Sequence, residues 1–246
     1  MNSFICWIGG KKLLRKDIIN NFPFDIDRYI EVFGGAGWVL FGKEPHKLEV
    51  LNDIDGELIN LYRCIKYHAE ALQKELEYML VSREQFFDYR DKSLNGMTDI
   101  QRAARYFYII KVSFGGNKDN FGGKNINVVN AVDYLSKISE RLKNVVIENK
   151  DFTNIIKVYD RPKALFYCDP PYFNTEKYYT AAEFGQEQHI QLRDILSNVK
   201  GKFILSYNDC DFIRKLYKDY NIIKVERQHN LKSDGSRFKE LIIKNY

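Results

Sequence analysis

The segment from Asp169 to Tyr172, an acid followed by two prolines and a tyrosine, gathers at one point side chains that could do chemistry. It follows 'ALFYC', an apolar run typical of a buried strand, and because proline cannot continue a strand ladder, the strand is predicted to end at Cys168. Asp169 and the carbonyl of Pro170 would then offer hydrogen-bond acceptors at the carboxyl end of a strand, where open α/β sheets usually bind ligands. The alternative is a stiff turn in which Tyr172 covers the core.

A glycine-rich turn, 'FGGAGWV', is predicted where a first strand passes into a helix. Glycines there let a ligand approach the backbone, and the helix start offers unpaired N–H groups to a negative group. The turn lacks full GxGxxG spacing, so by itself it is more often a tight turn than a cofactor site. A second strand, however, is predicted to end at Asn52 and Asp53, where an acid can accept hydrogen bonds from two ribose hydroxyls. The turn and Asp53 together favour a cofactor that carries a nucleoside.

These residues require a scaffold in which strands and helices alternate, and both ends of the chain predict one. 'RYIEVFGGAGWVLF' and 'KLEVLNDIDGELINLY' each read as a strand followed by a helix, and 'NVVIEN', 'ALFYC' and 'KFILSY' predict later strands separated by helices. The last two predicted strands, 'IIKVERQ' and 'KELIIKNY', are joined by a short Asp-Gly turn and should be antiparallel. We therefore predict an α/β fold with a mainly parallel sheet.

Between residues 63 and 143 the pattern changes to helices. 'AEALQKELEYMLVSREQFFDYRDK' has apolar residues at helical spacing, and 'DIQRAARYFYIIKVSF' continues the pattern. The helices are interrupted by 'GGNKDNFGGKNIN', which has no continuous apolar face and predicts an exposed loop or hairpin. We predict a core of residues 1–62 and 144–246 that carries a mainly helical insertion of residues 63–143.

Composition limits the class of protein. The chain has 38 Lys and Arg against 33 Asp and Glu, a net charge of +5 that suits a polyanionic partner without requiring one. Its four cysteines form no CxxC pair and its four histidines no HExxH arrangement, which argues against a zinc site and a disulfide framework. No run approaches the roughly 20 apolar residues of a membrane span. We expect a cytoplasmic protein without a metal ion or a membrane partner.

Three segments in a fixed order resemble the DNA adenine-N6 methyltransferases of the Dam type. These are 'CWIGGKKLL', the glycine turn and 'DPPY', and members of that family carry Trp-x-Gly-Gly-Lys, a glycine loop, a DNA-reading insertion and Asp-Pro-Pro-Tyr in the same order. The closing 'SRFKELIIKNY' also resembles the end of that family. The resemblance covers nearly the whole chain. It implies a Rossmann-like seven-stranded methyltransferase sheet with an antiparallel last strand and a helical recognition insertion, with S-adenosylmethionine as cofactor and double-stranded DNA as partner.

The resemblance also assigns residues to the cofactor. It places Lys11 near the carboxylate of S-adenosylmethionine, Trp7 near its methionine part and Asp53 on its ribose. Asp151 and Phe152 would meet the adenine by hydrogen bond and stacking. The implied cofactor-binding residues are Trp7, Lys11, Phe33, Gly34, Gly35, Gly37, Asp53, Asp151, Phe152 and Asp169. Without the family, Trp7 could equally be a core residue and Lys11 a solvated charge.

The chemistry of such a transfer suits the segment that begins at Asp169. An exocyclic adenine amine is a poor nucleophile because its lone pair is delocalised into the ring, so a site should accept hydrogen bonds from both of its N–H bonds. Asp169 and the carbonyl of Pro170 could accept them, and Tyr172 could stack on a base rotated out of the duplex. The sulfonium already activates the methyl group, so the enzyme supplies alignment and electrostatics rather than a metal ion. The predicted catalytic residues are Asp169, Pro170, Pro171 and Tyr172.

The chain departs from the family in two places. Val32 stands where many relatives have Pro, and 'VSFGGNKDNFGGKN' does not reproduce the hairpin pattern of members that read GATC, so GATC is not predicted. We still expect this loop to contact DNA, with Asn117 and Asn120 at base edges and Lys118 and Lys124 at phosphates. The alternative is a solvated surface loop.

Other functions share these motifs. Methylation of cytosine N4 or of an RNA adenine would use the same segment, and a relative that binds nucleic acid without catalysis would keep the fold. The order of the motifs favours DNA adenine, and the intact 'DPPY' argues against a non-catalytic relative. The sequence predicts neither the recognised bases, nor the oligomeric state, nor whether a restriction endonuclease is a partner.

Overall fold

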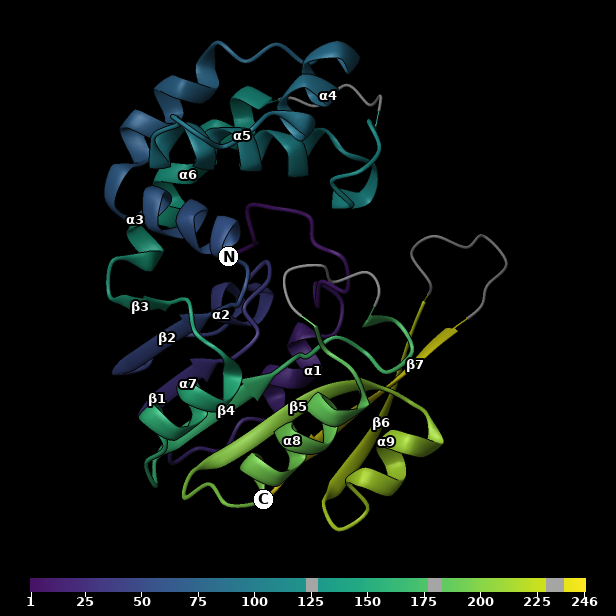
Figure 1. Ribbon diagram of the computed structural model, residues 1–246. Helices are drawn as coiled ribbons and strands as arrows, with labels where there is room; N and C mark the ends of the chain where they lie inside the picture. Colours follow the sequence, from purple (N-terminus) through teal and green to yellow (C-terminus); the bar gives the residue numbers. More distant parts are fainter. Residues whose placement is uncertain (123–127, 177–182, 229–236) are drawn as a thin grey trace.

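The computed structural model describes residues 1–122, 128–176, 183–228 and 237–246 of the chain (Figure 1). Its centre is a seven-stranded sheet with the strand order β3-β2-β1-β4-β5-β7-β6. The pairs from β3 to β5 are parallel, and β7 is antiparallel to both β5 and β6. The prediction of a mainly parallel α/β sheet with an antiparallel last strand is confirmed.

The strands are short, and the central ones are almost wholly buried. They are β1 (Arg28–Glu31), β2 (Leu48–Asn52), β3 (Val145–Glu148), β4 (Ala164–Cys168), β5 (Lys202–Asn208), β6 (Asn221–Gln228) and β7 (Arg237–Lys244). All five residues of β4 are buried because the strand has neighbours on both edges and is covered on both faces. It ends at Cys168, as predicted from the prolines that follow.

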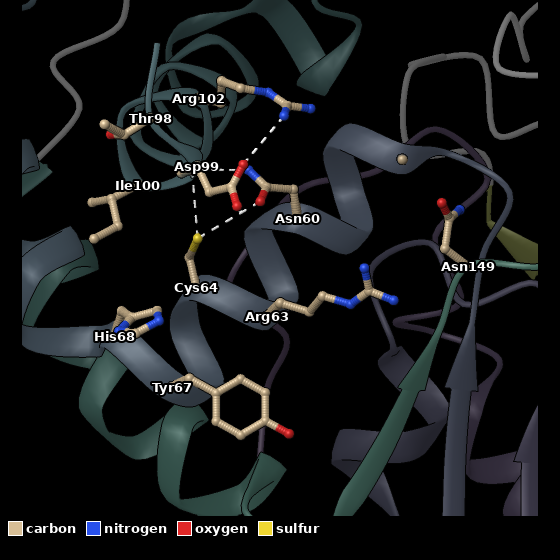
Figure 2. A pocket seen from close by; sticks show the side chains of 11 residues that line it. Asn60, Arg63, Cys64, Tyr67, His68, Thr98, Asp99, Ile100, Arg102 and Asn149 are labelled. Carbon is tan, nitrogen blue, oxygen red and sulfur yellow. Dashed lines mark hydrogen bonds and ion pairs between the residues drawn. The ribbon is translucent and has the colours of Figure 1, made fainter.

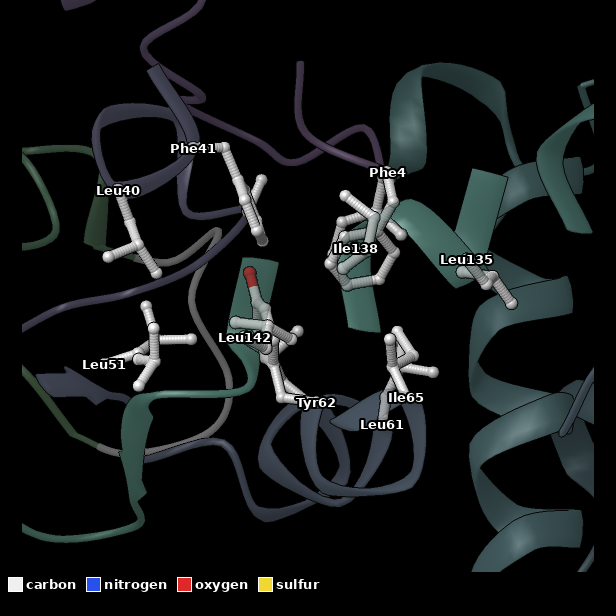
Figure 3. Close-up of a cluster of buried hydrophobic side chains, with 14 of the residues drawn as sticks. Phe4, Leu40, Phe41, Leu51, Leu61, Tyr62, Ile65, Leu135, Ile138 and Leu142 are labelled. Atoms are coloured by element: carbon white, nitrogen blue, oxygen red, sulfur yellow. The ribbon is translucent and has the colours of Figure 1, made fainter. Parts of the chain in front are cut away.

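Helices cover both faces of the sheet. On one face α1 (Arg15–Asn20), α2 (Trp38–Gly42), α3 (Gly56–Glu77) and α6 (Val128–Leu142) form a core with Leu165 and Tyr167 of β4. Figure 3 shows part of this core, in which Leu142 of α6 lies near Tyr62 of α3. On the other face α7 (Phe152–Tyr159), α8 (Gln186–Leu196) and α9 (Asp211–Leu216) pack against Phe166 and Cys168. Alternate residues of β4 thus serve opposite cores.

The region predicted as an insertion is helical. It contains the second half of α3, then α4 (Arg83–Asp91), α5 (Asp99–Val112), the short 3₁₀ helix η1 (Phe114–Gly116) and α6. In Figure 1 α4 and α5 lie beyond one end of the sheet. The proposed division at residue 63 falls inside α3, which is continuous apart from one non-helical residue, His68, so the division into two domains stays a prediction. None of the described helices is long and apolar enough to cross a membrane.

Candidate active site

Asp169 follows β4 directly and is held by two side chains. Its Oδ1 accepts a hydrogen bond from Ser206 Oγ at 2.8 Å and forms an ion pair with Lys11 Nζ at 2.7 Å. Burial raises the pKa of Asp169, and the contacts with Lys11 and Ser206 oppose this rise. The carboxylate still keeps 17 % of its side-chain surface exposed. It is therefore an oriented acid that a ligand can reach.

Lys11 is buried and faces this acid. Its ammonium group also donates to the carbonyl of Gly9 at 2.7 Å and lies 4.6 Å from the centre of the Tyr172 ring. The alternative of a solvated surface charge is wrong, because only 5 % of the Lys11 side chain is exposed. The role predicted for Lys11 at a cofactor carboxylate stays a prediction, while its observed partner is the predicted catalytic acid.

Tyr172 is held by two residues of β7. Its hydroxyl donates to Glu240 Oε2 of β7 at 2.9 Å, and its ring is stacked at 6.4 Å on Phe238. Burial raises the pKa of this hydroxyl well above its usual range. Pro170 is buried and Pro171 is partly buried. In this structure Tyr172 covers the core, and its stacking on a base stays a prediction.

The glycine turn and Asp53 lie together at the ends of β1 and β2. Gly35 has φ +47, and a Cβ placed there would come within 2.9 Å of the Trp7 ring. The backbone N–H of Gly35 donates to Asp53 Oδ2 at 2.8 Å, and that of Asp55 donates to Oδ1 at 2.9 Å. Burial nevertheless raises the pKa of Asp53 to about 6. Trp7, the turn and Asp53 therefore lie together, and their binding of a cofactor stays a prediction.

The remaining glycines shape the same turn. A Cβ at Gly34 would meet the Leu51 side chain at 2.7 Å, and Gly37, with φ +64, precedes α2 as its N-cap. Asn52, which the sequence analysis gave no role, donates to the carbonyls of Val32 and Lys150 at 2.9 and 3.0 Å. One buried amide therefore joins the loops that follow β1, β2 and β3.

Three aromatic rings gather beside this turn. The ring centre of Phe33 lies 5.7 Å from the ring centres of both Phe152 and Phe184, and the ring centres of Phe152 and Phe184 are 5.9 Å apart. Asp151 caps α7, because its Oδ1 accepts from the backbone N–H of Thr153 at 2.9 Å. The structure thus brings the predicted Phe33 and Phe152 together and adds Phe184.

The loop predicted to read DNA is packed against the N-terminal segment. A Cβ at Gly116 would come within 2.8 Å of the Cys6 carbonyl. Lys118 Nζ accordingly points inward: it lies 3.7 Å from Asp55 Oδ2, donates to the Tyr106 hydroxyl at 3.1 Å and lies 5.0 Å from the Trp7 ring. Lys118 therefore contacts the neighbours of Asp53, and its predicted phosphate contact is untested.

The asparagines of that loop stabilise its turn. Asn117 Oδ1 accepts from the backbone N–H groups of Asp119 and Asn120 at 3.1 and 3.2 Å, and the Asn120 carbonyl accepts from Phe114 at 2.8 Å. Lys124 lies outside the described residues. Contacts of Asn117, Asn120 and Lys124 with DNA stay predictions.

Two partners of the site were missed by the sequence analysis. Ser206 and Glu240 are buried polar residues in β5 and β7, and they bind Asp169 and Tyr172. A signal existed for Ser206, because 'KFILSY' places it inside an otherwise apolar strand pattern, whereas Glu240 stands beside Lys239 at the start of the apolar run of 'KELIIKNY' and was harder to single out. A buried polar side chain needs a partner, and here the partners are the predicted catalytic residues.

An open pocket lies elsewhere, between the start of α3 and the start of α5 (Figure 2). It is lined by residues that include Asn60, Arg63, Cys64, Tyr67, His68, Asp99, Arg102 and Asn149. None of the predicted catalytic or cofactor-binding residues lines it. Within the described residues no group of three or more His, Cys, Asp or Glu side chains could hold a metal ion.

Comparison with known proteins assigns the family. A family model described as D12 class N6 adenine-specific DNA methyltransferase matches residues 7–231. This chain belongs to that family. The prediction from 'CWIGGKKLL', the glycine turn and 'DPPY' is thereby confirmed. The match includes the strand ends and the helical region of this methyltransferase.

Three named relatives are similar to this methyltransferase over 97 to 100 % of its chain. It is 32 % identical to the Type II methyltransferase M1.LlaDCHI of Lactococcus lactis subsp. cremoris, over 100 % of this chain and 96 % of the relative. It is 28 % identical to the Type II methyltransferase M.CviBI of Paramecium bursaria Chlorella virus NC1A, over 100 % of both chains. A DNA adenine methylase of Haemophilus influenzae is 24 % identical, over 97 % of this chain and 92 % of the relative.

Proposed function

We propose that this methyltransferase transfers the methyl group of S-adenosylmethionine to N6 of an adenine that is rotated out of double-stranded DNA at a specific site. One observation carries the proposal: Asp53, the glycine turn and Asp169 follow three neighbouring parallel strands, β2, β1 and β4. Because the carboxyl ends of parallel strands lie at one edge of a sheet, a cofactor and a target base bound there would be adjacent.

The residues at this edge suit the proposed cofactor. Asp53 is a hydrogen-bond acceptor fixed by two backbone N–H groups, which fits a ribose with two hydroxyls. Gly35 lacks the Cβ that would collide with Trp7, so the Trp7 ring can lie against the turn, beside the proposed cofactor. Phe33 is partly exposed and offers aromatic surface to an adenine, and the buried Phe152 packs against its ring. When bound, S-adenosylmethionine supplies an activated methyl group.

Asp169 is the proposed acceptor for the target amine. Lys11 and Ser206 both bind Oδ1 and fix the orientation of the carboxylate, so Oδ2 is the proposed acceptor for an N–H group of the adenine. The carbonyl of Pro170 is the second proposed acceptor, since proline has no N–H that would repel an amine. Tyr172 is the proposed stacking partner of the base.

The DNA side of the proposal rests on the helical region. We propose residues 63–143 as the recognition insertion, with Asn117, Asn120 and Lys124 as DNA-contacting residues. The net charge of +5 supports a polyanionic substrate. The relatives in Lactococcus lactis and the Chlorella virus are named Type II methyltransferases, which supports the same type for this chain. We also propose that the protein acts in the cytoplasm, as expected from its sequence.

Sequencing that reports modified bases tests this proposal. DNA from cells that express the wild-type chain is expected to carry N6-methyladenine at one short motif, and DNA from cells that express Asp169→Asn is expected to carry none. N4-methylcytosine in place of N6-methyladenine, or methylation confined to RNA, would contradict the proposal and support one of the alternatives.

A further inference from the structure

His189, in the first turn of α8, is completely buried and lies beside the segment that follows 'DPPY'. Its Nδ1 is 2.8 Å from the hydroxyl of Tyr207 in β5, and its Nε2 is 3.1 Å from Glu176 Oε1. Both ring nitrogens therefore have partners, one on the sheet and one four residues beyond Tyr172. A buried imidazole with two specific partners is an orienting group rather than simple filling of the core.

The chemistry of the two partners fixes the tautomer of the ring. Against the opposing effect of burial, hydrogen bonds from its own backbone N–H and from His189 hold the pKa of Glu176 below its usual range, so it is an acceptor only. Burial lowers the pKa of His189, so the ring is neutral at neutral pH. His189 Nε2 therefore donates to Glu176, and Nδ1 accepts from Tyr207.

The ring of His189 also holds an aromatic side chain at the proposed cofactor site. Phe184 lies edge to face against it, with ring centres 4.9 Å apart and an interplanar angle of 82°. On its other side Phe184 contacts Phe33 and Phe152. Phe152 is nearly buried, whereas Phe184 is partly exposed and can offer a free surface to a ligand.

The same histidine reaches the proposed target side. Phe173 follows Tyr172 directly and lies 5.6 Å from the His189 ring, and Tyr207 lies 6.0 Å from Tyr172. Phe173 is further fixed by stacking at 4.3 Å on Phe212. His189 is thus the common contact of the side chains that flank both parts of the site.

We propose that Phe184 is a third aromatic wall of the pocket for the cofactor adenine, and that His189 is the positioning residue that holds it there through Glu176 and Tyr207. The inference rests on the proposed function, because it names a further contact of the same cofactor. It gives α8 a role in cofactor binding, although none of the residues predicted from the sequence lies on that helix.

Calorimetric titration with S-adenosylmethionine tests the role of Phe184. Phe184→Ala is expected to weaken binding about tenfold, because it removes a ring that stacks on the adenine base, whereas Phe184→Tyr keeps the ring and should bind as wild type does. The matched control is Phe212→Ala, which removes another partly buried ring whose centre lies 6.2 Å from that of His189 but which, among the described residues, forms no aromatic pair with Phe33 or Phe152. Wild-type affinity in Phe184→Ala would overturn the proposal.

Steady-state kinetics test the positioning role of His189. His189→Leu fills the space without either hydrogen bond and is expected to raise the KM for S-adenosylmethionine about fivefold or more, with a smaller change in the KM for DNA. His189→Gln keeps a donor that can reach Glu176 and should recover part of the loss. If His189→Leu lowers only the melting temperature while the KM for the cofactor is unchanged, His189 is a structural residue and the positioning role is wrong.

The wild-type protein separates failure of this inference from failure of the proposed function. If wild type neither binds S-adenosylmethionine in the titration nor methylates DNA, the proposed function is wrong and the inference falls with it. If wild type does both and Phe184→Ala binds equally well, only the inference is wrong. Should His189→Leu not fold, Phe184→Ala and His189→Gln still decide the question.

Discussion

Two regions were predicted to be functional: the edge of the sheet formed by the carboxyl ends of β2, β1 and β4, and the loop after α5. The sequence predicts the positions of side chains well at the first region and poorly at the second. At the edge, Asp53 and the glycine turn lie together and Asp169 projects from β4, all at the ends of parallel strands. In the loop, the partly exposed Lys118 contacts Asp55 and Tyr106, which the sequence did not predict. Regular backbone structure positions the first group, whereas tertiary packing orients the second.

The difference teaches which kind of residue a sequence can place. A strand end fixes the position and direction of the next side chain, since all parallel strands point the same way. A loop residue has no such constraint, and its partners come from whatever surface packs against it. Here that surface includes the segment around Trp7, which lies near the N-terminus and far from the loop in the sequence.

Among the residues at the edge of the sheet, the largest loss of activity is expected for Asp169→Asn. The amide keeps the shape of the carboxylate without its charge, so methyl transfer to duplex DNA is expected to fall at least about 100-fold in initial-rate measurements. The change also leaves the buried Lys11 without its anionic partner and should lower the melting temperature. The double variant with Lys11→Met should regain stability but not activity. A rate within about tenfold of wild type would contradict the role of Asp169.

A smaller but still large effect is expected at Asp53. Asp53→Ala removes the proposed acceptor for two ribose hydroxyls and should raise the Kd for S-adenosylmethionine about 10- to 100-fold, as hydrogen bonds to a charged group contribute about 1.5–3 kcal/mol. Calorimetry measures the cofactor, and a gel-shift titration should give an unchanged DNA affinity. Equal losses for cofactor and DNA would mean that Asp53 acts on the whole fold.

The pH dependence of cofactor binding sharpens the same point. The pKa of Asp53 is raised to about 6 by burial, so the carboxylate is charged at pH 7 and takes up a proton as the pH falls through about 6. A protonated carboxyl is a weaker acceptor, so affinity for S-adenosylmethionine should be full above about pH 7 and fall about tenfold by about pH 5. Titrations across this range measure it. In Asp53→Asn the fall should disappear, and if it persists another group causes it.

Lys118→Met is expected to have the smallest effect on cofactor binding. Because Lys118 belongs to the loop but contacts residues beside the proposed cofactor site, this variant tests both regions. If the inward contacts with Trp7 and Asp55 define its role, the Kd for the cofactor should rise about two- to fivefold, since a cation–π contact contributes about 0.5–1 kcal/mol. The salt dependence of DNA binding should stay as in wild type. A salt slope that falls by about 1 with unchanged cofactor affinity would instead support a phosphate contact.

The sequence predicts the fold and the strand-end residues for a physical reason. Proline stops β4 at Cys168, and the apolar stretches before the glycine turn and before Asp53 locate β1 and β2, so the residues that follow these strands lie at one edge. The partners of Asp169 are a different matter. Lys11 and Ser206 lie far away in the chain, and only three-dimensional packing brings them to the same oxygen.

The position of Phe184 is the hardest to predict from the sequence. It follows no strand, and its contacts with Phe33 and Phe152 depend on how α8 lies against the sheet through His189. A lone phenylalanine before a helix carries no periodic signal and no polar requirement. Its environment is therefore set by tertiary structure alone.

The pairing of β2 with β3 has a consequence for how this enzyme can change during evolution. Glu49 pairs with Val145, so the whole helical region is a loop closed by two adjacent strands of the sheet. The entropy of closing a loop grows only slowly with its length, by about 0.6 kcal/mol for each doubling. The loops that join the helices between β2 and β3 can thus change in length at little entropic cost, provided that α3 and α6 still cover the sheet. If the helical region reads DNA, as we propose, such changes would alter the target sequence while the residues at the strand ends stay the same.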